Sequence, residues 1–249
     1  MSDVLTLTWR QFRLERRMFW RNPSAAFFSF ALPLLFLFLF GALMNGNTHD
    51  LQIIVPGIAG LSVMATTFNA LAMNMTFLRE QGVLKRMRGT PLPTPALLGG
   101  IVGNAAANAM IQIAIVVLAG RFLFGLGWPK DWLELVVFTL AGVACFASLG
   151  IAYSHVIPNF EAAPAYTNIV FLPMIFISGV FYDVKQVPHF LRAIAEVFPL
   201  VHVIDGLSGA LVTGVGLAHN LDDLAVVLAW AAFGIVFAVR GFSWSARTA

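Results

Sequence analysis

The chain contains six apolar runs that are long enough, or nearly long enough, to cross a lipid bilayer. A transmembrane helix needs about 20 mostly apolar residues. Only 11% of the residues are charged, whereas a soluble domain carries roughly 25%. The sequence therefore predicts an all-α membrane protein, with residues 1–249 forming a single transmembrane domain. Its six transmembrane helices are expected at residues 25–44, 51–75, 97–119, 132–155, 164–181 and 222–240.

The basic residues are divided unevenly between the two sides of the membrane. Lys and Arg are enriched in cytoplasmic loops. If the N-terminus is cytoplasmic, eleven of the fifteen Lys and Arg residues lie on that side. The other four, Arg121, Lys130, Lys185 and Arg192, then lie outside. The sequence therefore predicts that both termini are cytoplasmic.

Residues 3–21 form an amphipathic segment before the first span. On a helix, Leu5, Trp9, Phe12 and Phe19 share one face, and four arginines share the other. Arg16 falls on the apolar face, where its aliphatic stem could lie along the membrane while the charge reaches water. We expect a helix in the cytoplasmic membrane interface. The alternative is a simple basic anchor that fixes the topology.

Two hydrophilic segments separate spans on the same predicted cytoplasmic side. Residues 76–91 combine a basic cluster with Gly82 and end in Thr90-Pro91, and residues 155–164 form a shorter loop. A short basic helix between two spans suits docking to a soluble partner. The alternative is a basic loop that only maintains the topology.

The segment between the fifth and sixth spans is long and apolar, and it is interrupted by Pro188, Pro199 and Gly206. Irregular backbone at membrane depth is tolerated only where protein or a cavity surrounds it. The sequence therefore predicts a re-entrant pair of short helices on the outer side, at about 188–198 and 200–212. The alternative is a helix pair that lies flat on the membrane surface.

The spans carry a few polar side chains at helical spacing. Polar groups in a span are costly unless they pair with one another or face water. They could line a weakly polar translocation path, or they could form hydrogen bonds between helices. The candidate path residues are Thr66, Asn69, Met73, Asn104, Asn108, Gln112, Asn168 and Ser178.

Four features together resemble the permeases of ABC-2 type ATP-binding-cassette exporters, particularly the small six-span members. The first is the N-terminal helix ending in Arg-Asn-Pro, and the second is REQGVLKRMRGTPLP. The third is NIVFLPMIFISGVFYDVKQVPHFLRAIAEVFPLVHVIDGL, and the fourth is the spacing of the six spans. The chain departs from the family pattern at Asp183 and at Leu207-Ser208, where family members often have Pro and Arg.

The resemblance implies that a separate ATPase supplies the energy, with two permease chains, expected to be a homodimer, and two ATPase chains. The chain has no G-x-x-x-x-G-K-[ST] motif, so we expect this chain to bind no cofactor, while ATP and Mg²⁺ bind to the partner. In this interpretation Glu80 lies near the start of the short docking helix within residues 76–91, where a carboxylate favours the helix dipole, and Gly82 allows close backbone approach. The residues expected to contact the ATPase are Arg79, Glu80, Gly82, Lys85, Arg86, Arg88 and Glu161.

The predicted function is export of a hydrophobic or amphiphilic compound, such as a drug, antibiotic or lipid-like molecule, across a bacterial inner membrane. The hairpin would act as an external gate, with Pro188, Phe198, Pro199 and Asp205 as its candidate residues. Polysaccharide export is an alternative, and a secondary transporter or channel is a less favoured one. The scattered histidines and the single Cys145 indicate neither a metal site nor an enzyme. The basic residues cluster at membrane borders, so no nucleic-acid partner is expected.

Overall fold

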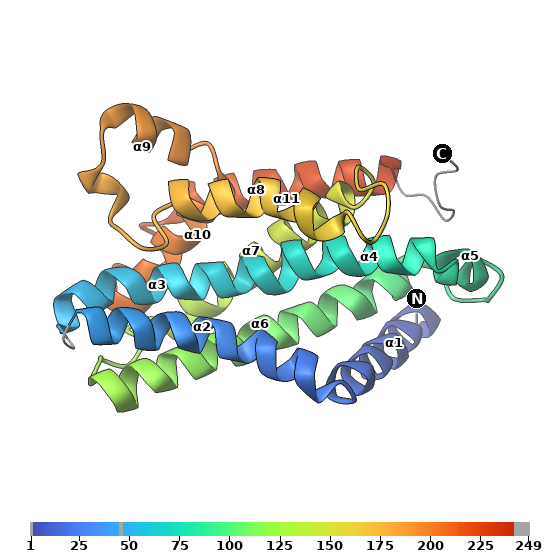
Figure 1. Cartoon of the computed structure of the whole chain (residues 1–249), viewed down its shortest axis with the longest axis horizontal. Coiled ribbons are helices and arrows are strands. Elements are labelled where there is room, and N and C mark those ends of the chain that lie inside the picture. Colours follow the sequence, from blue (N-terminus) through green and yellow to red (C-terminus); the bar gives the residue numbers. More distant parts are fainter. Residues whose placement is uncertain (1, 45–46, 242–249) are drawn as a thin grey trace.

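The structure is a computed structural model that describes residues 2–44 and 47–241. Within these ranges every regular element is a helix, and no strand occurs. The long helices run roughly alongside one another (Figure 1). We call one end of the bundle the α5 end, because it carries α5, α1 and the C-terminal end of α11, and the opposite end the α9 end (Figure 1). The elements are α1 (Ser2–Trp20), α2 (Pro23–Leu43), α3 (Thr48–Met64), the π-helix η1 (Ala65–Asn69), α4 (Ala70–Glu80), α5 (Val83–Arg88), α6 (Thr94–Phe124), α7 (Trp132–Tyr153), α8 (Ala163–Ile177), the 3₁₀ helix η2 (Val184–Gln186), α9 (His189–Ala195), α10 (Pro199–Ser208), the π-helix η3 (Gly209–Thr213) and α11 (Leu221–Gly241).

Five helices in the described residues are long and apolar enough to cross a membrane. They correspond to the first, second, third, fourth and sixth predicted spans, which confirms the all-helical membrane architecture. The second is one continuous helix made of α3, η1 and α4. The five spans are Ala26–Leu43, Asp50–Glu80, Thr94–Phe124, Trp132–Tyr153 and Leu221–Arg240.

The predicted fifth span, residues 164–181, contains a shorter helix than expected. Helix α8 has 15 residues, which corresponds to about 22 Å. It ends just before Gly179, whose φ of 74° is the left-handed conformation that commonly terminates helices. The following α9 and the α10–η3 helix are bent by 93° relative to each other, and counting this bent pair as a span gives a total of six.

Helices α9 and α10 form a hairpin whose turn is held against α11. The indole Nε1 of Trp230 donates a hydrogen bond to the carbonyl oxygen of Val197, at 3.0 Å. Trp230 is nine residues after Leu221, the first residue of α11, so the turn lies about 14 Å along that helix. Both ends of the hairpin lie towards the α9 end (Figure 1). A bent helix pair is therefore present where the re-entrant pair was predicted, at His189–Ala195 and Pro199–Thr213.

The core of the bundle is built around α3, α7 and α10, and it includes the fully buried Phe138, Phe146, Leu200 and Leu207. Small residues let these helices approach closely, as is usual where lipid removes the hydrophobic driving force between helices. A Cβ atom added to Gly206 of α10 would lie only 2.2 Å from the ring of Phe138 on α7. The 18-residue apolar window of Asp50–Glu80 is 78% buried, against 22% for the windows of α2 and α11. Helix α3–η1–α4 is thus central, and α2 and α11 are peripheral.

Candidate functional site

Helix α1 packs directly on α6 along the ridge of small residues that begins at Gly99. A Cβ atom at Gly100 would lie 2.5 Å from Cγ of Gln11 and 2.9 Å from the backbone nitrogen of Phe12. Gln11 is buried as a result. The small residues of α6 therefore receive the N-terminal helix. Helix α1 is amphipathic as predicted, but part of it is seated on the bundle.

Arg16 of α1 is directed into the bundle and does not extend along the membrane surface as expected. Its Nη1 donates to the side-chain oxygens of Asn108 and of Asn104, the latter at 3.4 Å. The guanidinium carbon also lies 5.8 Å and 5.6 Å from the ring centroids of Phe19 and Trp20, within the range of cation–π attraction. Burial lowers the pKa of Arg16, but arginine remains protonated in proteins. Two of the predicted path amides thus hold a cation from α1.

A cavity of about 350 Å³ lies between α1, α2, η1 and α6. We call it the amide cavity. Thr66, Asn104, Asn108 and Gln112 line it together, so the structure brings four of the predicted path residues to one place. Gln112 also links α6 to α2, because its Nε2 donates to the carbonyl oxygen of Ser29 at 2.9 Å. The same amide side chains therefore form hydrogen bonds between helices and line a cavity.

The other predicted path residues lie elsewhere. Met73 packs beside the small cluster formed by Ala72, Ile157 and Ala163. Asn168 is exposed on the outer surface of α8. The Oδ1 atom of Asn69 is buried and has no hydrogen-bond partner among the described residues. The remaining one, Ser178, lines a different cavity near the α9 end. Within the described part of the chain these residues therefore lie at several separate places.

The predicted docking segment 76–91 consists of two helices and a turn. Helix α4 continues to Glu80, and α5 begins at Val83. Gly82 separates them with a φ of 66°, and nothing lies within 4 Å of a Cβ atom placed there. Within this chain its role is therefore a left-handed turn. Glu80 lies at the C-terminal end of α4, so the expected interaction with the N-terminus of the short helix is absent.

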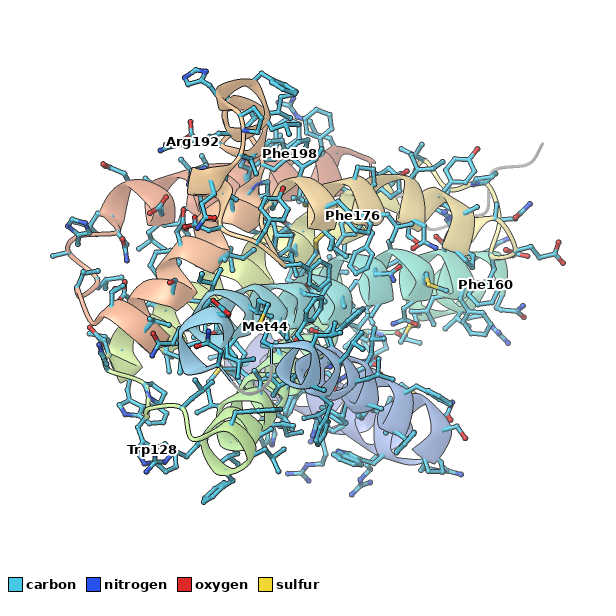
Figure 2. The ribbon with its side chains drawn as sticks, turned by 60° about the vertical axis from the view of Figure 1, so that its left-hand side comes forward. Met44, Trp128, Phe160, Phe176, Arg192 and Phe198 are labelled. Carbon is cyan, nitrogen blue, oxygen red and sulfur yellow. The ribbon has the colours of Figure 1, made fainter. Side chains whose placement is uncertain are left out.

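Arg79 and Glu80 connect this segment to the loop that follows α7. The Nη2 atom of Arg79 donates to the carbonyl oxygens of Ser154 and Ile157, at 2.6 Å and 3.1 Å. The carboxylate of Glu80 accepts a hydrogen bond from the backbone N–H of Phe160. The two segments that were predicted to contact an ATPase therefore form one continuous surface. Figure 2 shows Phe160 far from Arg192 and Phe198 of the hairpin.

The charged side chains on this surface point outwards. Leu84 of α5 is buried in a cluster with Met75, Leu97 and Ile101, which anchors the short helix to α4 and α6. Lys85, Arg86 and Glu161 are exposed. The side chain of Arg88 lies outside the described part of the structure. We call the exposed surface of α5 and residues 154–162 the basic platform, because Lys85 and Arg86 dominate its charge.

A second cavity of about 350 Å³ lies beside the hairpin at the α9 end, and Ser178, Arg192, Glu196 and Asp205 are among its lining residues. Arg192 and Glu196 form an ion pair of 2.8 Å on the outer surface. The other gate candidates lie at the starts of the two hairpin helices. Pro188 precedes α9, Phe198 precedes α10, and Pro199 is the first residue of α10.

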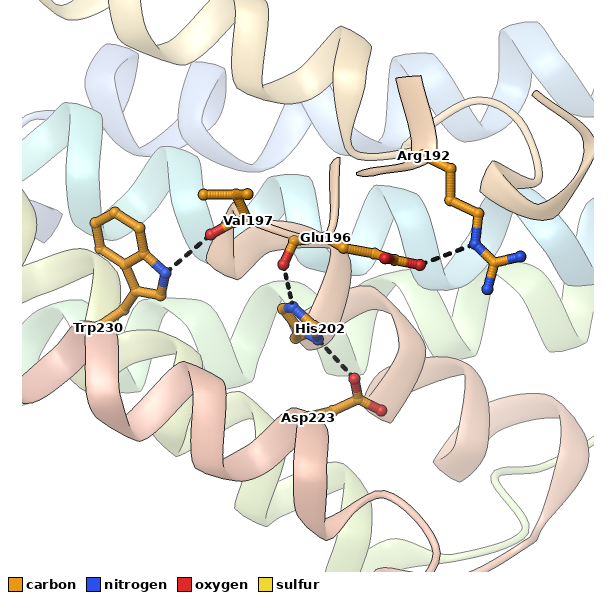
Figure 3. A network of polar contacts seen from close by, with 6 residues as sticks. All are labelled: Arg192, Glu196, Val197, His202, Asp223 and Trp230. Atoms are coloured by element: carbon orange, nitrogen blue, oxygen red, sulfur yellow. Dashed lines mark hydrogen bonds and ion pairs between the residues drawn. The ribbon is translucent and has the colours of Figure 1, made fainter. Parts of the chain in front are cut away.

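His202 joins the hairpin to α11 (Figure 3). Its Nδ1 lies 2.6 Å from Oδ1 of Asp223, and its Nε2 lies 2.9 Å from the carbonyl oxygen of Glu196. A neutral imidazole has one N–H donor, so both bonds to these acceptors form together only when the ring is protonated.

This geometry predicts that His202 stabilises the contact between α10 and α11. We expect His202→Phe to lower the apparent melting temperature in nanodiscs, because it removes the hydrogen bonds with Asp223 and the Glu196 carbonyl. His189→Phe, the same change at an exposed histidine of α9, should leave it intact. Equal melting temperatures for the two variants would contradict the assignment.

One buried carboxylate was not predicted from the sequence. Glu134 in the first turn of α7 is completely buried, and its Oε1 accepts a hydrogen bond of 2.6 Å from Nδ2 of Asn220. Its Oε2 has no hydrogen-bond partner among the described residues. In the sequence, Glu134 lies at the edge of an apolar run and resembles a charge at the membrane interface. In the structure it is buried because η3 and Asn220 pack over it. In the described ranges no group of three or more His, Cys, Asp or Glu could hold a metal ion.

The five long apolar helices, the amphipathic α1 packed on α6 and the bent pair of α9 and α10 define a polytopic membrane protein. Short accessory helices lie at both ends of its bundle. Residues 2–212 match the family described as ABC-2 type transporter. The match covers most of the chain, which therefore belongs to this family. It is a permease subunit, and members of the family lack a nucleotide-binding domain and pair with separate ABC ATPase subunits.

Several relatives are similar over most of their length. The inner membrane transport permease YadH of Escherichia coli K12 is 23% identical over 178 residues, 69% of each chain. Nodulation protein J of Sinorhizobium fredii is 27% identical over 235 residues, 88% of each chain. The daunorubicin resistance ABC transporter permease protein DrrB1 of Streptomyces coeruleorubidus is 28% identical over 214 residues, 81% of this chain and 72% of the relative.

Proposed function

We propose that this chain is the membrane subunit of an exporter that moves a hydrophobic or amphiphilic compound out across a bacterial inner membrane. Two copies of the chain would assemble with two ATPase subunits, which bind ATP and Mg²⁺. The α5 end and both termini would face the cytoplasm. The amide cavity, which combines polar side chains with the rings of Phe19 and Phe28, supports an amphiphilic substrate. So does the similarity to a permease named for daunorubicin resistance.

The basic platform is the observation that carries the proposal. Its exposed Lys85 and Arg86 stand on a short helix that the buried Leu84 fixes to two spans. A rigid, charged projection of this kind can transmit force from a soluble partner, whereas a flexible loop cannot. Arg79 and Glu80 would transmit the same movement to the start of the next loop.

Helix α1 offers a second route for the movement. It carries four arginines and lies on α6 with backbone-level contact at Gly100. A displacement of α1 would therefore move α6 directly. Two pairs of tryptophans are exposed, Trp9 and Trp20 on α1 and Trp128 and Trp132 at the α9 end. Because tryptophans are enriched at both membrane–water interfaces, they support placing α1 at one membrane surface and the α9 end at the other.

The exposed surface of α8 supports assembly with a second copy. Asn168 is exposed there beside Ile169, Leu172 and Phe176. An amide that faces lipid is costly, so a protein partner or an aqueous path should cover this surface. A two-fold pair with α8 near its axis would place Asn168 on the path between protomers, as the sequence predicted.

Co-purification tests the proposal. The chain is extracted from its native membrane with a mild detergent, the associated proteins are identified by mass spectrometry, and ATP hydrolysis is measured. We expect a P-loop ATPase in a 1:1 ratio to the permease, with turnover that requires the permease. A chain that purifies without any nucleotide-hydrolysing partner would contradict the proposal and favour a secondary transporter or channel.

A further inference from the structure

We propose that the amide cavity binds the polar head of an amphiphile that carries hydroxyl or ammonium hydrogen-bond donors. This site lies inside one protomer, between α1, α2, η1 and α6, and not between two chains. The inference adds a ligand class to the proposed export function, and it rests on that function only for the biological role of the ligand.

Gln112 supplies the main evidence for a missing donor. Its side chain is 3% exposed and lines the cavity. Its Nε2 donates a hydrogen bond to the carbonyl oxygen of Ser29, while its Oε1 has no hydrogen-bond partner among the described residues. A buried acceptor without a partner costs free energy. A ligand hydroxyl or ammonium group in the cavity would remove that cost.

The hydroxyl groups beside Gln112 are also acceptors towards the cavity. Ser62 donates to the carbonyl oxygen of Ile58, and Thr66 donates to that of Ser62, both at 2.7 Å. Each hydroxyl has one hydrogen to donate and two lone pairs to offer. Because the hydrogens are already used, these oxygens can only accept from a ligand. The π-helix η1 contains Thr66, and such local widening of a helix is frequent at functional sites.

The α1 side of the cavity adds a carboxylate. Glu15 lines the cavity and accepts a hydrogen bond of 2.8 Å from Gln11. Burial raises the pKa of Glu15, and the hydrogen bond from Gln11 offsets part of that effect. An ammonium group of a ligand would offset the cost of burying the ionised carboxylate of Glu15. Arg16 occupies the oxygens of Asn104 and Asn108, so these two atoms are already satisfied without a ligand.

The size and the apolar walls indicate the rest of the ligand. A volume of about 350 Å³ is at the lower end of the range for small-molecule pockets, so it suits a head group and not a whole amphiphile. Phe19, Phe28 and Leu32 line the same space. Apolar surface next to acceptor groups matches the junction between a polar head and its hydrocarbon chain.

The test compares two probes with the same alkyl chain, octyl glucoside and octylphosphocholine, of which only the glucoside has hydrogen-bond donors. The full chain in lipid nanodiscs is titrated below the micelle concentration, and affinity is obtained from the rise in melting temperature. We expect the glucoside to bind at least tenfold more tightly. Gln112→Met and Thr66→Val should each abolish most of that difference. Gln52→Met, the same change at an exposed position of α3, should preserve it.

Equal affinity for the two probes, or unchanged glucoside binding in both Gln112→Met and Thr66→Val, would overturn the proposal. Two further outcomes identify the source of the ligand. A membrane lipid that co-purifies with the wild type and is lost in Gln112→Met identifies a lipid ligand. Stimulation of the complex's ATP hydrolysis by the glucoside, without such a lipid, identifies an exported compound. The binding experiment contains no ATPase, so a failure of ATPase coupling leaves its result unaffected.

Discussion

Lys85→Glu combined with Arg86→Glu is expected to abolish permease-dependent ATP hydrolysis and export while leaving the fold intact. Both side chains are exposed on α5, and changes at exposed positions usually alter stability by no more than about 0.5 kcal/mol. An acidic surface on the ATPase would face two new negative charges. Like charges across an interface cost several kcal/mol, so we expect the affinity for the ATPase to fall on the order of a hundredfold.

The measurement is co-purification with the ATPase, followed by ATP hydrolysis in nanodiscs. The matched control is Lys130→Glu with Arg192→Glu, which makes the same change of charge near the α9 end. Both side chains are exposed, and Arg192 forms an ion pair with Glu196 on the outer surface. The control should retain ATPase binding. If the α5 variant also binds the ATPase and exports at the wild-type rate, the basic platform is not the docking surface.

Gly57→Ala is expected to be strongly destabilising, by about 3 kcal/mol. A Cβ atom at Gly57 of α3 would lie 2.0 Å from the carbonyl oxygen of Val180 and within 3 Å of two other backbone atoms of that residue. Backbone atoms cannot turn aside as a flexible side chain can, so α3 and the segment that leads into the hairpin must separate. The segment that leads into the hairpin would lose part of its packing against α3.

The measurement is the apparent melting temperature of the purified chain, together with its yield in the membrane. Gly127→Ala is the matched control, because nothing lies within 4 Å of a Cβ atom at that position and its φ is not positive. We expect the control to behave like the wild type. Equal melting temperatures for the two variants would show that the contact between α3 and residue 180 contributes little.

The positions of the long helices could be predicted because a bilayer imposes a length and a composition on each span. The helix pair could also be predicted, since Pro188 and Pro199 interrupt an apolar segment and irregular backbone at membrane depth needs protein around it. Helix α8 was predicted too long because apolar composition continues through Ser178–Val180, whereas the left-handed Gly179 ends the helix earlier. Hydropathy does not detect a change of backbone direction.

The candidate sites could be predicted in part. The basic residues of the platform are visible because charge is rare in this chain. The link from Arg79 to Ser154 and the insertion of Arg16 between Asn104 and Asn108 join residues 75 or more positions apart, and no local pattern encodes such pairs. His202 and Asp223 likewise meet only because α10 re-enters the bundle beside α11.

The sequence alone determined that this chain spans a membrane as helices, which segments lie at its borders, and that its charge gathers on α1 and α5. These properties follow from hydrophobicity and helical periodicity, which are local. Only the tertiary structure decided which polar side chains pair across helices, and which remain beside a cavity. That choice depends on contacts at small residues such as Gly57, Gly100 and Gly206, where fractions of an ångström determine which helices can approach one another.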